Sequence, residues 1–207
     1  TERLVGSEMC IRDRFLLILM EIDYVLKQKI LLPNIIASEI LIEKQDIRLT
    51  QSQSDNIFSI TEYENKRERF NQNFKKTFSL DIPEVGKFTW NKNSKVIWLR
   101  VNAYFVVTKE SYHDVMNKFH EVASITDQTG GWGALNLEGK FTKSVLEKLL
   151  TIDLDLFSKN EALRASINKI NCLVLCDKQS EVYTIYCPSS FLETMKTRLI
   201  DLINLVA

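Results

Sequence analysis

The segment Ile125–Phe157, ITDQTGGWGALNLEGKFTKSVLEKLLTIDLDLF, carries the most information about the fold. Its pattern predicts a short strand that ends at Asp127, turns through Gly130-Gly131 and continues as an alternating strand from Trp132. Gly139 then breaks the strand. We expect positive φ angles at both glycine turns, because glycine has no Cβ. Apolar residues follow, first at helical spacing and then as a second apolar edge: Val145, Leu146, Leu149 and Leu150, then Ile152, Leu154 and Leu156.

The rest of the chain mixes helical and strand patterns. It predicts strands Ile57–Thr61, Lys87–Trp90, Lys95–Arg100, Tyr104–Thr108, Ala123–Asp127, Trp132–Leu137, Leu163–Ile167, Cys172–Leu175 and Val182–Cys187. It predicts helices Glu64–Phe78, Tyr112–Val122, Thr142–Leu150 and Phe191–Leu205. Ser111 is a suitable N-cap for the second helix, and Phe70, Phe74 and Phe78 form an apolar stripe along the first. Strands joined by short hairpins and mixed with helices predict an α+β fold with antiparallel-rich sheets.

We divide the chain into four parts by composition and pattern. Residues 1–14 resemble translated sequencing-adapter sequence of the kind found at the ends of metagenomic reading frames, and are expected to be a non-native leader. Residues 15–46 are expected to be an N-terminal helical extension. Two α+β halves follow, 47–122 and 123–207. The polar stretch Gln45–Asn56 is interpreted as a linker or exposed loop.

The order of strand, glycine turn, strand, glycine, helix and Asp-Leu-Asp-Leu in Ile125–Phe157 resembles the folate-binding superfamily of the glycine-cleavage T-protein. Within that superfamily it looks most similar to the gamma subunit of heterotetrameric sarcosine oxidase. Lys95–Thr108, KVIWLRVNAYFVVT, is similar to the family's paired strands, although the usual Gly-Pro is absent and Tyr104 replaces a Trp. Ser189–Phe191 resembles the start of the closing helix. The match runs from about Ile47 to Ala207.

This resemblance implies two packed β-α-β units, like the folate-binding domain of the T-protein superfamily. It implies a noncatalytic gamma subunit, in a complex that oxidatively demethylates sarcosine to glycine and passes the one-carbon unit to tetrahydrofolate. FAD, FMN, NAD, zinc and tetrahydrofolate would then belong to the alpha, beta and delta subunits, and this chain would bind none of them. Two alternatives stay open: a stand-alone folate-dependent aminomethyltransferase-like protein, and a small metabolite-binding regulatory α+β module.

Composition excludes some functions. Lys plus Arg and Asp plus Glu number 27 each, so overall charge favours neither nucleic acid nor an anionic membrane. No apolar run approaches the roughly 20 residues that cross a bilayer. The chain contains no dinucleotide fingerprint, P-loop, nucleophile elbow or zincin motif. Few cysteines, none in a CxxC pair, favour buried thiols in a reducing cytoplasm over disulfides or zinc.

The candidate interface or cleft residues are Asp127, Gly130, Gly131 and Trp132. Asp127 could contact a pterin or an amine, or it could accept backbone N–H groups in an Asx turn. Trp132 could line a cleft, anchor a partner subunit or pack in its own core. The twin glycines would let another surface approach the backbone closely.

No catalytic or metal-binding residue is predicted. His113 and His120 lie seven residues apart on a predicted helix, and no partner that would orient them as general bases is evident. Asp153 and Asp155 alternate with leucines, so both carboxylates are expected on the solvent face of a strand. Cys172 and Cys176 share strand parity with Val174 and are expected to point into one core.

Overall fold

The computed structural model describes residues 39–52, 55–178 and 181–206, all of which belong to one compact unit, Ala37–Ala207. The expected leader 1–14, with Cys10, and the expected helix Phe15–Leu32 lie outside these described residues.

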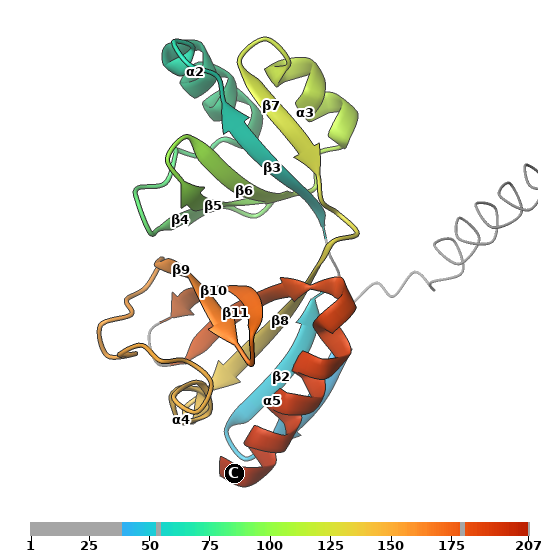
Figure 1. Cartoon of the computed structure of the whole chain (residues 1–207), viewed down its shortest axis with the longest axis vertical. Coiled ribbons are helices and arrows are strands. Elements are labelled where there is room, and N and C mark those ends of the chain that lie inside the picture. Colours follow the sequence, from blue (N-terminus) through green and yellow to red (C-terminus); the bar gives the residue numbers. More distant parts are fainter. Residues whose placement is uncertain (1–38, 53–54, 179–180, 207) are drawn as a thin grey trace, which may run out of the picture. The chain divides into compact units, whose positions relative to one another are not determined.

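The described strands form two antiparallel sheets (Figure 1). The six-stranded sheet has the order β1-β2-β8-β11-β10-β9, and the five-stranded sheet has the order β4-β5-β6-β3-β7. The first contains β1 (Glu39–Lys44), β2 (Ile47–Ser52), β8 (Trp132–Gly139), β9 (Ala162–Ile167), β10 (Ile170–Lys178) and β11 (Val182–Pro188). The second contains β3 (Asn56–Glu62), β4 (Phe88–Trp90), β5 (Ser94–Arg100), β6 (Ala103–Thr108) and β7 (Ala123–Asp127).

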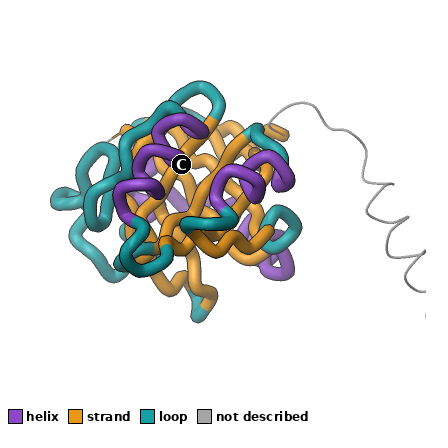
Figure 2. Tube along the Cα trace, turned by 90° about the horizontal axis from the view of Figure 1, so that it is seen from above, coloured by secondary structure: helices purple, strands orange, loops and turns teal. Residues whose placement is uncertain are grey.

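Helices are fewer than strands among the described residues (Figure 2). They are α2 (Arg67–Phe78), α3 (Tyr112–Phe119), α4 (Thr142–Leu146) and α5 (Leu192–Val206), with a 3₁₀ turn η1 at Ser189–Phe191. Ser111 caps α3 as predicted, because its Oγ accepts a hydrogen bond from the Asp114 N–H. Antiparallel sheets with separate helices confirm the α+β fold class.

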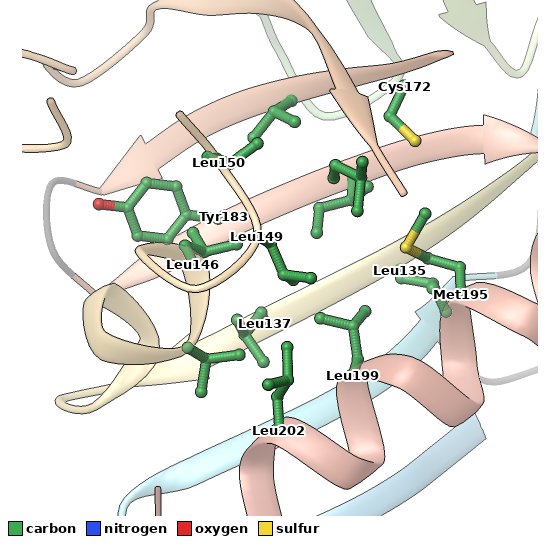
Figure 3. Close-up of a cluster of buried hydrophobic side chains, with 14 of the residues drawn as sticks. Leu135, Leu137, Leu146, Leu149, Leu150, Cys172, Tyr183, Met195, Leu199 and Leu202 are labelled. Atoms are coloured by element: carbon green, nitrogen blue, oxygen red, sulfur yellow. The ribbon is translucent and has the colours of Figure 1, made fainter. Parts of the chain in front are cut away.

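The six-stranded sheet packs one face against α4 and α5. Leu135 and Leu137 of β8 meet Leu199 of α5 in this core, which Figure 3 shows. Cys172, Val174 and Cys176 of β10 point into the same core, so the predicted parity is confirmed.

The five-stranded sheet packs one face against α2 and α3 through an aromatic cluster. Phe70, Phe74 and Phe78 recur every four residues along α2, so they lie on one face of the helix, and all three are buried. The rings of Phe70 and Tyr104 stack with centroids 5.9 Å apart. The predicted phenylalanine stripe is therefore core packing.

A third apolar cluster joins the opposite faces of the two sheets. Phe105 of β6 meets Tyr186 of β11 edge to face, with ring centroids 5.6 Å apart. Lys95 of β5 also pairs with Asp177 of β10, with 2.8 Å between Nζ and Oδ1. Each sheet thus has one face toward its helices and one toward the other sheet.

Several local expectations are wrong. Gln45–Asn56 is not an exposed loop, because Ile47 and Leu49 are fully buried in β2. β1 (Glu39–Lys44) is a strand, although it lies within the helical extension expected over residues 15–46. The stretch from Ile152 to Leu156 turns instead of forming a strand. The helix expected to end at Leu150 ends at Leu146.

Strand pairing crosses the boundary at 122/123 that separates the two halves along the chain. β2 from the N-terminal side pairs with β8, and β7 from the C-terminal side pairs with β3. Each sheet is therefore assembled from both halves, and β7 and β8 belong to different sheets although only four residues separate them.

Candidate functional site

A cavity of about 690 Å³ lies between the inner faces of the two sheets. The five-stranded sheet contributes residues of β3, β5 and β6, and the other sheet contributes residues of β8 to β11. The lining residues are Ser59, Leu99, Arg100, Ala103, Phe105, Gln128, Trp132, Arg164, Ala165, Ser166, Asn171, Cys172, Leu173 and Pro188. We call this space the inter-sheet cavity. Its size is that of small-molecule sites in proteins, about 300–1,000 Å³.

Trp132 forms an aromatic wall of the inter-sheet cavity. It begins β8 on the same side of the strand as buried Ala134, because side chains two residues apart share a face. Its ring meets Phe105 edge to face at 5.4 Å between centroids, and its Nε1–H donates to Gln128 Oε1 at 3.0 Å. Trp132 is half-buried, so part of its side chain remains accessible.

Asp127 is exposed beside this cavity and does not line it. Its Oδ1 accepts hydrogen bonds from the Thr129 N–H at 2.9 Å and from Thr129 Oγ1 at 2.6 Å. The Thr129 hydroxyl oxygen in turn accepts from the Ile57 N–H at 3.0 Å. The carboxylate therefore forms the Asx turn that was one of its two interpretations, and through Thr129 it holds β7 against β3.

The twin glycines form the tip of this turn, and both are exposed. The Gly131 N–H donates to Gln128 O, and Ser189 Oγ donates to Gly130 O at 2.9 Å. The expected positive φ is wrong for this pair and right for Gly139, whose φ is 123°. Gly130 and Gly131 therefore permit close approach of another surface without a left-handed conformation.

Sequence reasoning missed two arginines in the inter-sheet cavity. Arg100 ends β5 and Arg164 lies in β9, so the two reach the cavity from opposite sheets. Both are exposed, which places them toward its solvent-facing side. No local pattern marks either residue, since an arginine on a strand is normally a solvated side chain. Only the packing of the two sheets brings them to one cavity.

The other candidate residues lie elsewhere. His113 and His120 are exposed on α3 and at its end, and neither lines the inter-sheet cavity. Asp153 and Asp155 are exposed, as expected, but in a turn: Asp153 Oδ1 accepts the Asp155 N–H, and Asp155 pairs with Lys143. The Asp153 carboxylate therefore stabilises the turn, and the Asp155 carboxylate ties the turn to α4 through Lys143.

The three described cysteines are buried thiols. Desolvation raises the pKa of Cys172 to about 12, and those of Cys176 and Cys187 to about 11. Within the ranges that the structure describes, no three His, Cys, Asp or Glu side chains gather as a metal would require. In the same ranges, no helix has the length and apolarity needed to cross a bilayer.

A chain with a similar fold occurs in the solved structure of heterotetrameric sarcosine oxidase from Corynebacterium sp. U-96 in complex with pyrrole 2-carboxylate. The likeness has a TM-score of 0.69 at 18% sequence identity, over 81% of the present chain and 88% of that chain. No protein-family model and no curated protein matches the present chain. At this identity the likeness shows a shared fold, and the matched chain is slightly shorter than the present one.

Proposed function

We propose that this chain is a noncatalytic accessory subunit of gamma type in a sarcosine oxidase complex. The observation that carries the proposal is the fold likeness to a chain of the Corynebacterium complex, which extends over most of both chains. A match confined to a common supersecondary motif would leave much of one chain uncovered. The motif order in Ile125–Phe157, which suggested the same relationship, adds a second line of support.

In this role the chain would assemble with alpha, beta and delta subunits. Those partners would carry the flavins, NAD, zinc and tetrahydrofolate, and would oxidise the N-methyl group of sarcosine. The contribution of this chain would be structural, through an interface that buries roughly 800 Å² on each partner.

The turn Asp127–Trp132 is the part of the surface that best fits such an interface. Gly130 and Gly131 expose backbone without side chains, and Trp132 is half-buried, so part of its side chain remains accessible. An aromatic ring held by its own hydrogen bond loses little conformational entropy when a partner covers it. Asp127 holds the turn in place through Thr129.

Co-expression with the genes that neighbour this one tests the proposal. The tagged chain should retain alpha, beta and delta subunits, and the purified complex should form hydrogen peroxide from sarcosine. The chain alone should show neither flavin absorbance nor sarcosine oxidation. Turnover by the isolated, flavin-free chain, or failure to retain any of these subunits, would refute the accessory role.

A matched pair of variants tests the turn. Trp132→Ala should reduce retention of the partners by about tenfold or more, as expected for an interface anchor. Trp90→Ala is the control, because Trp90 is 56% exposed and lies on the edge strand β4. Equal retention by both variants would place the interface elsewhere. Circular dichroism of each isolated variant separates lost binding from lost folding.

A further inference from the structure

The inter-sheet cavity carries positive charge without a negative counterpart. Arg100 and Arg164 line it, and none of its lining residues is acidic. Of the other four arginines in the described ranges, Arg48, Arg67 and Arg69 each pair with a glutamate, and Arg198 on α5 forms no ion pair with a described residue. Arg100 and Arg164 form no ion pair or side-chain hydrogen bond with any described residue. Two guanidinium groups, each with five N–H donors, thus line one cavity without a described acidic partner.

The two arginines approach the cavity from different sheets. Arg164 shares a strand face with buried Ala162, which belongs to the apolar cluster between the sheets. Arg100 ends β5, where the register with β6 is irregular. An anion between them could accept paired hydrogen bonds from planar guanidinium groups, a geometry that suits a carboxylate or a phosphate.

The rest of the cavity provides an apolar wall and a few polar groups. Trp132, Phe105 and Leu173 supply the apolar surface, and the amides of Gln128 and Asn171 supply further donors or acceptors. Because the edge-to-face contact with Phe105 fixes the Trp132 ring, a flat ligand can stack on it with little reorganisation. A mainly apolar lining with a few polar groups is the usual composition of a small-molecule site.

We propose that the inter-sheet cavity binds a small organic anion. Its flat apolar part packs against Trp132, and its carboxylate or phosphate group binds Arg100 and Arg164. This inference stands independently of the accessory role, because it rests on residues of this chain alone. It applies equally to a chain that acts by itself.

Isothermal titration calorimetry of the chain with matched probes tests the chemistry. 2-Naphthoate should bind about tenfold more tightly than 2-naphthamide, which has the same ring system without the charge. The affinities of 2-naphthyl phosphate and 2-naphthoate are then compared to identify which oxyanion the site prefers. Tighter binding of either one supports the proposal. Acetate and inorganic phosphate should bind more weakly than both, because they lack a ring to place on Trp132.

Variants assign binding to the site. Arg100→Gln and Arg164→Gln should each weaken 2-naphthoate binding by about tenfold and leave 2-naphthamide binding unchanged. Arg198→Gln is the matched control: Arg198 is also exposed and unpaired among the described residues, but lies on α5 and does not line the cavity. All three changes remove one positive charge. Unchanged melting temperatures would show that the variants fold.

Three results would overturn the proposal. The first is equal affinity for the naphthoate and the naphthamide. The second is equal weakening by Arg198→Gln and by the two cavity variants, which would indicate a response to net charge alone. The third is no detectable binding of either naphthyl anion at millimolar concentration.

Discussion

Gly139 and Asp46 lie in direct backbone contact: a Cβ on Gly139 would stand 1.6 Å from the carbonyl oxygen of Asp46. Gly139 ends β8 and pairs with Ile47. Its φ is 123°, a backbone conformation that residues other than glycine rarely adopt. The glycine that breaks the diagnostic segment is therefore the point where the β1–β2 hairpin closes onto β8.

Gly139→Ala should destabilise the fold by more than about 3 kcal/mol. Backbone strain alone costs about 1–3 kcal/mol, and the clash with backbone adds to it. Gly86→Ala is the matched control, because Gly86 also has a positive φ, 72°, but nothing lies within 4 Å of its added Cβ. It should cost only about 1–2 kcal/mol. Thermal unfolding measures both, and equal losses would show that the Asp46 contact carries no energy.

Phe74→Ala should cost about 3–5 kcal/mol, because it removes a fully buried ring from the centre of the aromatic cluster. Phe74 contacts Phe70, Phe78 and Tyr104. Phe141→Ala makes the same chemical change at a ring that is 42% exposed, and should cost much less. Urea unfolding of the two variants checks this, and a similar cost for both would contradict the assigned core.

The buried thiols should be unreactive in the folded chain. In a Cys10→Ser background, Cys172, Cys176 and Cys187 should resist a disulfide reagent at pH 8, because burial raises their pKa values to about 11–12. All three should react in guanidinium chloride. Rapid labelling of the native chain would contradict their burial.

The same thiols should make stability fall at high pH. In the unfolded chain they ionise near their usual pKa of about 9, whereas in the folded chain they stay protonated to about pH 11. The unfolded state therefore releases protons first, and stability is lost as pH rises from about 9 to 11. Replacing Cys176 with Ala should flatten this part of the profile of melting temperature against pH.

Lys95 and Asp177 should couple the two sheets. Their 2.8 Å ion pair is about three-quarters buried, and Thr184 Oγ1 donates a second hydrogen bond to the Asp177 carboxylate. A double-mutant cycle with Lys95→Met and Asp177→Asn should give a coupling energy of about 1 kcal/mol, above the usual value for exposed pairs. The cycle for Lys75 and Asp81, which are 72% and 80% exposed, is the control. Equal coupling in both cycles would contradict a stabilising role between the sheets.

The local elements of this fold follow from the order of residues. Three features depend on neighbours within a few positions: the four-residue spacing of three phenylalanines along α2, the Ser111 cap and the turn at Asn91. Asn91 Oδ1 accepts the N–H groups of Asn93 and Ser94, within the same short turn. Such short-range interactions are the same in any fold that contains them, and therefore can be inferred before the fold is known.

Strand pairing depends on tertiary structure. The sequence of β2 predicts a loop because only Ile47 and Leu49 are apolar among polar neighbours. Their burial requires β8 and the helix side of the six-stranded sheet. β2 and β7 each pair with a strand from the other half of the chain, β8 and β3 respectively, and the paired residues lie more than 60 positions apart. No local periodicity specifies such partners.

The candidate site shows the same division. Adjacent residues set the strand that begins at Trp132 and the Asx turn at Asp127, so the local pattern predicts the strand and offers the turn as one of two interpretations. Tertiary structure alone decided that Arg100 and Arg164 line one cavity with Trp132, since they lie on strands of different sheets, 64 positions apart. The sequence shows that both residues are positively charged, but the two charges come to one cavity only when the sheets pack.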